Sequence, residues 1–192
     1  MTNGSVNGMR VAILLGDNFE QVEMTEPRTA LEAAGAHTTL VSPVHGEIHG
    51  VQHDQELQDS FEVDLPLVQA NPEDFDALLL PGGALNADSM RMVPEVQEFI
   101  RRMQGAGKPM AVICHAPWEL VSAGAIEGRT LTSYYTLQDD IRNAGGTWLD
   151  REVVRDRNLV TSRQPGDIPA FNREMLALFA EHYSHATEPR AA

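Results

Sequence analysis

The stretch MAVICHAPWEL, residues 110–120, passes from a strand pattern into a helix pattern at one sharp junction. Residues 110–114 form a short apolar run of the kind that is buried in parallel sheets. Residues 116–123 predict a helix, which Gly124 ends. A strand that leads directly into a helix is the repeating unit of α/β folds. The only cysteine of the chain, Cys114, lies at the junction, and His115 follows it.

The same alternation of strands and helices continues on both sides of this stretch. Toward the N-terminus, the patterns predict strands at residues 11–15, 38–42 and 75–80, and helices at residues 20–34 and 94–106. Pro27 predicts a kink or a separate short helix at the start of the first of these helices. Residues 43–70 predict hairpins and loops. Toward the C-terminus, the patterns predict a strand at 130–133, a helix at 138–144, a hairpin at 152–155 and 159–162, and a helix at 168–183.

These elements predict one domain, residues 9–185, built as a doubly wound, mostly parallel sheet sandwiched by helices. A chain of 192 residues can bury a full core, and its 42% hydrophobic and 22% charged fractions are ordinary for a globular protein. Residues 1–8 and 186–192 predict disordered tails.

The charge balance excludes some classes of partner. The net charge is −14, from 28 acidic and 14 basic residues, which argues against a nucleic-acid binder and against binding to an anionic membrane surface. The start of the chain lacks an apolar signal core, and no apolar run approaches the roughly 20 residues of a membrane span. One cysteine allows no internal disulfide. We therefore expect a cytoplasmic protein.

No cofactor or metal motif stands out. His45, His49 and His53 have helical spacing, but Gly46 and Gly50 lie between them, so a solvated polar stretch is favoured over a zinc site. Neither the phosphate loop GxxxxGK[ST] nor a GxGxxG after the first strand is present. We expect neither a metal nor a nucleotide cofactor.

Three unusual segments follow predicted strands. They are residues 17–23 (DNFEQVE), residues 81–83 (PGG), and Cys114 with His115. In open α/β sheets, ligands bind at the carboxyl ends of the strands. The three segments therefore predict a single site.

The position of Cys114 favours a nucleophile. A thiol between a buried strand and a helix resembles a nucleophile elbow, and the helix N-terminus is expected to lower the pKa of the thiol. A buried structural cysteine is the alternative, with roughly even odds from position alone. His115 can act as a base through its imidazole, or supply only its backbone N–H to an oxyanion hole.

The other two segments carry weaker signals. The Gly82-Gly83 turn can aim a backbone N–H at an oxyanion, although tight turns use glycine for conformational reasons alone. Glu20 and Glu23 share a helix face, so one of them could exchange a proton with the thiol. Taken alone, favourable acidic charge in a first helical turn is the more probable reading of that pair.

Five motifs together resemble the ThiJ/PfpI superfamily, especially its PfpI-like intracellular protease and general stress protein branch, over residues 10–183. They are VAILLGDNFEQVE, FDALLLPGG, MAVICHAPWEL, LTSYYTLQDDIRNAGG and LVTSRQPGDIPAF. The resemblance implies a flavodoxin-like, class I glutamine amidotransferase-like fold. It also implies that Cys114 is the nucleophile, that Glu23 hydrogen-bonds its thiol, and that His115 assists. The Gly83 and His115 N–H groups would form the oxyanion hole.

The resemblance implies further site positions. Glu20 lies close to the thiol, and Tyr134 lines the site, at a position that is His in the parkinsonism-associated branch. An acid after the Gly-Gly turn orients the histidine in the PfpI branch, in some cases from a neighbouring subunit. Asp88 is the candidate here, although the spacing is one residue longer. The family is generally oligomeric, so a homodimer or higher homo-oligomer is expected.

The family's activities leave three hypotheses. The leading one is a cysteine-dependent stress-response hydrolase that acts on methylglyoxal or dicarbonyl-modified (glycated) molecules through a hemithioacetal on Cys114. The second is an intracellular cysteine peptidase with Cys114, His115 and Asp88 as the triad and peptides as substrates. The third is a non-enzymatic oxidative-stress sensor or protective protein, in which Cys114 is oxidised.

Overall fold

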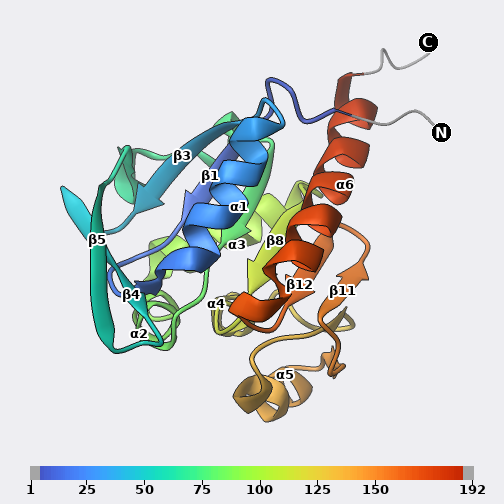
Figure 1. The fold of residues 1–192 in the computed structure, drawn as a ribbon. Coiled ribbons are helices and arrows are strands. Elements are labelled where there is room, and N and C mark those ends of the chain that lie inside the picture. The colour runs from blue at the N-terminus through green and yellow to red at the C-terminus, as the bar shows by residue number, and fades with distance from the viewer. Residues whose placement is uncertain (1–4, 188–192) are drawn as a thin grey trace.

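A central parallel sheet organises the molecule (Figure 1). The computed structural model describes residues 5–187, with side chains up to residue 184. Seven strands lie side by side in the order β11 (Val153–Asp156), β12 (Leu159–Ser162), β8 (Met110–Ile113), β7 (Ala77–Leu80), β1 (Arg10–Leu14), β3 (His37–Ser42) and β6 (Leu65–Pro66). Only the β11–β12 pair, which forms the predicted hairpin, is antiparallel.

Helices cover both faces of this sheet. They are α1 (Gln21–Ala33), α2 (Ala84–Met90), α3 (Pro94–Gly105), α4 (Pro117–Ser122), α5 (Gln138–Asn143) and α6 (Ile168–Thr187). Successive strand residues point to opposite faces, so Ile13 packs in one core cluster with α1 and α6, and Leu14 packs in a second with α3, α4 and α5 (Figure 1). The predicted doubly wound fold is confirmed.

Two small sheets lie beside the central one. β2 (Phe19–Glu20), β4 (Glu47–Gln52) and β5 (Glu56–Glu62) form a three-stranded sheet, and β9 (Thr130–Leu131) pairs with β10 (Thr147–Trp148). The strand predicted at residues 130–133 is therefore shorter and lies outside the central sheet. Within residues 5–187, the remaining elements are four short 3-10 turns: η1 (Leu67–Gln69), η2 (Pro72–Asp74), η3 (Tyr135–Leu137) and η4 (Pro165–Asp167).

Three predictions about the helices and the N-terminal tail need correction. α1 runs through Pro27 as one helix, because Pro27 lies on the same buried face as Met24 and Leu31, and this burial offsets the lost hydrogen bond. Helix α2 was not predicted; it begins directly after Gly83 without a side-chain cap. In the predicted N-terminal tail, Val6 is only 3% exposed and belongs to the core.

The C-terminal helix is longer than predicted. Helix α6 extends to Thr187, past the predicted domain end at residue 185. Residues 1–4 and 188–192 lie outside the described part of the chain. No helix within the described residues is both long and apolar enough to span a membrane.

Candidate active site

Cys114 lies on a tight turn at the carboxyl end of β8. Strand β8 ends at Ile113, one residue earlier than predicted, because Cys114 adopts a left-handed backbone conformation with a φ of 63°. Its N–H donates to the Ser162 carbonyl at 3.0 Å, and its carbonyl accepts the Tyr134 N–H at 2.8 Å. A non-glycine residue in this conformation stores backbone strain, which its surroundings must hold in place. The turn has the backbone geometry of a nucleophile elbow.

The turn brings the thiol and the neighbouring imidazole together. The Cys114 Sγ and the His115 Nδ1 are 3.2 Å apart, although adjacent residues on a strand would point in opposite directions. The His115 ring is 7% exposed and stacks on the Tyr134 ring, with centroids 4.5 Å apart and planes at 28°. Trp118 also contacts the His115 ring, with a centroid distance of 5.6 Å and planes at 53°. These aromatic contacts fix the imidazole next to the sulfur.

Glu23, on the first turn of α1, lies beside the same thiol. Its side chain is completely buried, and its Oε2 accepts the Gly82 N–H at 3.0 Å. A β-carbon added to Gly82 would lie 2.5 Å from the Glu23 Oε2 and 2.6 Å from the Cys114 Cβ. Only glycine lets the carboxyl and the thiol approach this closely. The Glu23 Oε1 has no hydrogen-bond partner among the described residues.

The electrostatics of this pair differ from the sequence prediction. Burial raises the pKa of the Cys114 thiol, the Glu23 carboxylate raises it further, and the Gly83 N–H lowers it. Burial also raises the pKa of Glu23 well above its usual range. The predicted lowering of the thiol pKa is wrong because Cys114 is only 6% exposed and lies beside the Glu23 carboxylate, and both effects raise the pKa. Because two neighbouring anions repel each other, the Glu23 carboxylate disfavours ionisation of the Cys114 thiol.

Two backbone N–H groups face the region of the thiol. Gly83 has a φ of 96°, and a β-carbon there would lie 2.7 Å from the Glu20 nitrogen. The Gly83 N–H is directed at the Cys114 sulfur. Within the described residues, neither the Gly83 nor the His115 N–H donates to a backbone carbonyl. Neither N–H is therefore held by a backbone carbonyl, as an oxyanion hole requires.

A pocket of about 170 Å³ opens onto these groups. It brings together six of the seven residues that the sequence analysis proposed for the site, and adds three that it did not propose. The lining residues are Glu20, Glu23, His53, Asp54, Gly83, Cys114, His115, Tyr134 and Pro165. A larger cavity of about 240 Å³, next to Met9 and Lys108 at the amino ends of the strands, contains no cysteine. The chemistry therefore points to the smaller pocket.

The seventh predicted residue, Asp88, does not line this pocket within a single chain. It is exposed on α2. Asp54 is the acid that lies near His115 instead. Burial lowers the pKa of His115, so the imidazole is neutral at neutral pH, and the Asp54 charge partly opposes this effect. The contribution of Asp88 from a neighbouring subunit stays a prediction.

His53 and Asp54 were missed because their approach to the site depends on a long-range pairing. They occupy the turn between β4 and β5, and both have left-handed φ values, 55° and 56°. Parallel pairing of β2 with β4 places Glu20 opposite Val51, two residues before this turn. In the sequence, only their place among polar residues of the predicted hairpin region, residues 43–70, could have pointed to them.

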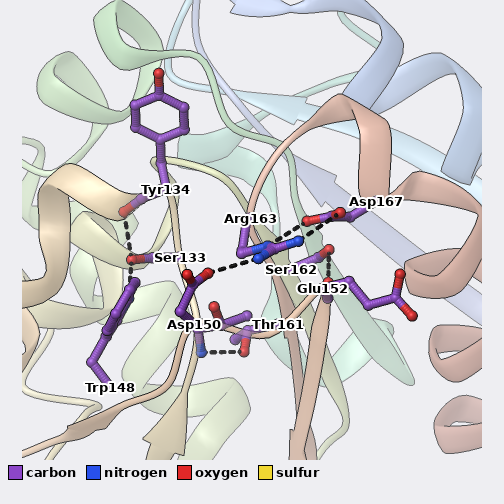
Figure 2. A network of polar contacts seen from close by, with 10 residues as sticks. Ser133, Tyr134, Trp148, Asp150, Glu152, Thr161, Ser162, Arg163 and Asp167 are labelled. Atoms are coloured by element: carbon purple, nitrogen blue, oxygen red, sulfur yellow. Dashed lines mark hydrogen bonds and ion pairs between the residues drawn. The ribbon is translucent and has the colours of Figure 1, made fainter.

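An ion-pair network supports the segment that contributes Pro165. The Arg163 guanidinium donates to both oxygens of Asp167, at 2.8 and 3.2 Å, and to Asp150 at 2.6 Å. Figure 2 shows Arg163 between these two carboxylates. Paired, bidentate contacts of this kind restrict the geometry of a loop. They hold the short turn η4, which begins at Pro165, against the end of β12.

A second chain of contacts supports Tyr134. The Trp148 Nε1 donates to the Ser133 Oγ at 3.0 Å, and the Ser133 Oγ donates to the Tyr134 carbonyl at 2.8 Å (Figure 2). The residues that line the pocket are thus positioned by neighbours outside it. Within residues 5–187, no group of three or more His, Cys, Asp or Glu side chains is arranged to hold a metal ion.

Comparisons with known proteins match this architecture. The model of the DJ-1/PfpI family matches residues 9–178. Deglycase PfpI of Pyrococcus furiosus is 42% identical over 170 residues, which cover 88% of this chain and 99% of that protein. General stress protein 18 of Bacillus subtilis is 40% identical over 173 residues, 89% and 98% of the two chains. A two-domain protein from Anabaena variabilis, with DJ-1/ThiJ/PfpI-like and ferritin-like domains, has a TM-score of 0.81 and 30% identity over 95% of this chain and 52% of its own.

Proposed function

The chain belongs to the DJ-1/PfpI family, and from that premise we propose that it is a cysteine-dependent stress-response hydrolase acting on methylglyoxal or dicarbonyl-modified molecules. A relative named deglycase supports the class of reaction, and one named general stress protein supports a role in the stress response. One observation carries the mechanism: the Cys114 Sγ lies 3.2 Å from the His115 Nδ1, beside the buried Glu23 carboxyl.

The first step is attack by the sulfur of Cys114. The thiolate forms an S–C bond with the aldehyde carbon of methylglyoxal, and the Gly83 and His115 N–H groups stabilise the developing oxyanion. The oxyanion then takes the proton that Glu23 holds, which gives a neutral hemithioacetal. On a glycated amine, the sulfur attacks the carbinol carbon, the C–N bond breaks, and the amine leaves with the same proton. Both substrates reach the same intermediate.

The second step converts the intermediate into an acid. The Glu23 carboxylate removes the proton from the sulfur-bearing carbon and returns it to the neighbouring carbonyl carbon. The hydroxyl proton on the sulfur-bearing carbon moves to the oxygen of that carbonyl, which gives a lactoyl thioester. Water then adds its hydroxyl to the acyl carbon as the C–S bond breaks, and its proton returns to the pair of Cys114 and Glu23. The products are lactate and, from a glycated amine, the free amine. The neutral imidazole of His115 can assist each proton transfer.

Release of lactate tests this proposal. Methylglyoxal and preformed adducts, freed of unbound methylglyoxal, are incubated with the wild-type chain and with Cys114→Ser. We expect lactate from the wild type and at least about 1,000-fold less from the variant, because the variant retains only binding and the oxyanion hole. Circular dichroism and the melting temperature check that Cys114→Ser is folded. Equal turnover by the two proteins would overturn the mechanism.

A cysteine peptidase is the second candidate, and the contact between Cys114 and His115 favours it. Such an enzyme needs a third group to orient the imidazole. Asp88 of a neighbouring subunit and Asp54 of the same chain are the two acids proposed for this role. Cleavage of a casein-derived peptide that is lost in Asp88→Asn but kept in Asp54→Asn would support the first arrangement. No cleavage by the wild-type chain would remove this candidate.

A further inference from the structure

The wall of the Cys114 pocket carries negative charge without a balancing cation. Three carboxyl groups line it, those of Glu20, Glu23 and Asp54, and no lysine or arginine does. Glu23 has a role in the proposed reaction, whereas the carboxyl groups of Glu20 and Asp54 have none and can contact another part of a substrate. A pocket with this lining disfavours an anionic substrate and attracts a cationic one.

Asp54 is held in place by the protein backbone. Its Oδ1 accepts the Ala84 N–H at 2.6 Å, next to Gly83. The left-handed turn of His53 and Asp54 fixes the direction of the side chain, and the Asp54 N–H contacts the Glu20 Oε2 at 3.4 Å. The carboxylate is half-buried, and its charge reaches both His115 and Cys114. Asp54 is therefore a preorganised anion at the reacting centre.

The free oxygens of these acids point to a ligand. Within the described residues, the Asp54 Oδ2 takes part in no hydrogen bond, and Glu20 accepts only the long contact from Asp54. The Glu23 Oε1, fully buried in the same pocket, is also without a partner. Of these oxygens the Glu23 Oε1 is the fully buried one, and buried polar oxygens in native proteins normally have a donor. A substrate with several N–H donors would supply what the chain does not.

We propose that the pocket selects dicarbonyl adducts borne on a guanidinium group, with Asp54 as the residue that recognises the cation; this inference rests on the proposed function. A guanidinium is planar, stays charged at neutral pH and presents parallel N–H donors that match a carboxylate. An adduct on a guanidine nitrogen leaves the other nitrogens free to contact Asp54 while the carbinol carbon faces Cys114. An adduct on a thiol has no cation and makes no such contact.

The experiment compares two preformed methylglyoxal adducts, those of N-acetyl-arginine amide and N-acetyl-cysteine amide. The rate of lactate release is measured for the wild type, Asp54→Asn and Glu56→Gln. Asp54→Asn keeps the oxygen that accepts the Ala84 N–H. Glu56→Gln makes the same change of charge on the same hairpin, at an exposed residue outside the pocket.

We expect Asp54→Asn to lower kcat/KM for the arginine adduct by at least about tenfold, mainly through KM, and to change it for the cysteine adduct by less than about threefold. Glu56→Gln should leave the ratio of the two kcat/KM values unchanged. Equal losses on both adducts would overturn the proposal, since Asp54 would then act through His115. Equal wild-type rates on both adducts would also overturn it, whereas no turnover of either adduct would refute the proposed function itself.

Discussion

Glu23 and Glu119 are two fully buried acids in different parts of the molecule. Burial raises the pKa of both carboxyls well above the usual range. Glu23 lies in the active-site pocket, accepts the Gly82 N–H and adjoins Cys114. Glu119 is on α4, a helix that packs against α2, α3 and α5, and neither of its oxygens has a partner among the described residues.

The difference shows that burial alone does not make a functional acid. Burial raises the pKa of both carboxyls and so favours their protonated forms. Of the two, Glu23 has the Cys114 thiol beside it, which in the proposed mechanism takes and returns this proton. Burial of the Glu119 carboxyl costs desolvation free energy, and no described residue accepts a hydrogen bond from it. The two residues should therefore respond oppositely to removal of the carboxyl.

The largest effect is expected at Glu23. Glu23→Gln keeps the size of the side chain and an oxygen that can accept the Gly82 N–H, but it removes the exchangeable proton. We expect kcat for lactate formation to fall by at least about 100-fold, the usual contribution of a positioned acid or base. Stopped assays with preformed adducts measure it. A decrease of less than about threefold would make Glu23 no more catalytic than Glu119.

The next effect should come from separating Glu23 and Cys114 sterically. In Gly82→Ala, the new methyl would meet both side chains and the Ile113 carbonyl at 2.8 Å or less. We expect a loss of about 1–3 kcal/mol in the free energy of unfolding, together with reduced turnover. Gly105→Ala, at the end of α3 with open space around it, is the matched control. It should fold at least as stably as the wild type; a similar loss in both variants would contradict the steric explanation.

At Glu119 the expected change is a gain of stability. Glu119→Met removes two unsatisfied oxygens and keeps a similar side-chain length, so the free energy of unfolding should rise by about 1–3 kcal/mol. Turnover should stay within about twofold of the wild type. Urea unfolding followed by circular dichroism measures the first quantity. A destabilised, inactive Glu119→Met protein would show that Glu119 has a partner after all.

The same variant predicts a pH dependence of stability. The pKa of Glu119 in the folded chain lies above the ordinary value of 4.5, so the folded state keeps a proton that the unfolded state releases. The carboxyl's contribution is therefore complete below that ordinary value and is lost as the pH rises toward the folded pKa. Between pH 5 and 8, the urea midpoint should fall more in the wild type than in Glu119→Met. Parallel curves for the two proteins would refute this.

The smallest effect is expected at an exposed acid. Asp88 lies on the outer side of α2, and Asp88→Asn should change lactate formation by less than about twofold. Turnover measured at several protein concentrations separates the alternatives. A large loss in Asp88→Asn, together with a wild-type rate that falls on dilution, would show that Asp88 reaches His115 from a partner subunit.

The sequence predicted the part of the site that depends on local order along the chain. Strand ends on one sheet edge brought together Glu23, Gly83 and Cys114, as expected from the alternation of strands and helices. The missed parts depend on burial and on distant pairing. Burial, which a sequence does not display, reversed the predicted shift in the thiol pKa. Asp54 reaches the pocket because β2 pairs with β4. Short polar strands give only a weak sequence pattern, so this pairing is hard to predict.

The hairpin of β4 and β5 has a consequence for how this protein can change. It contributes His53 and Asp54 to the pocket but belongs to a small sheet of its own, beside the central one (Figure 1). Cys114, the proposed nucleophile, is by contrast fixed to the central sheet through Ser162. In the two proposals, the reacting thiol and the residue that selects the substrate therefore belong to different sheets. Exchanging residues 47–62 between relatives should therefore change which substrate is preferred and leave the reaction at Cys114 unchanged.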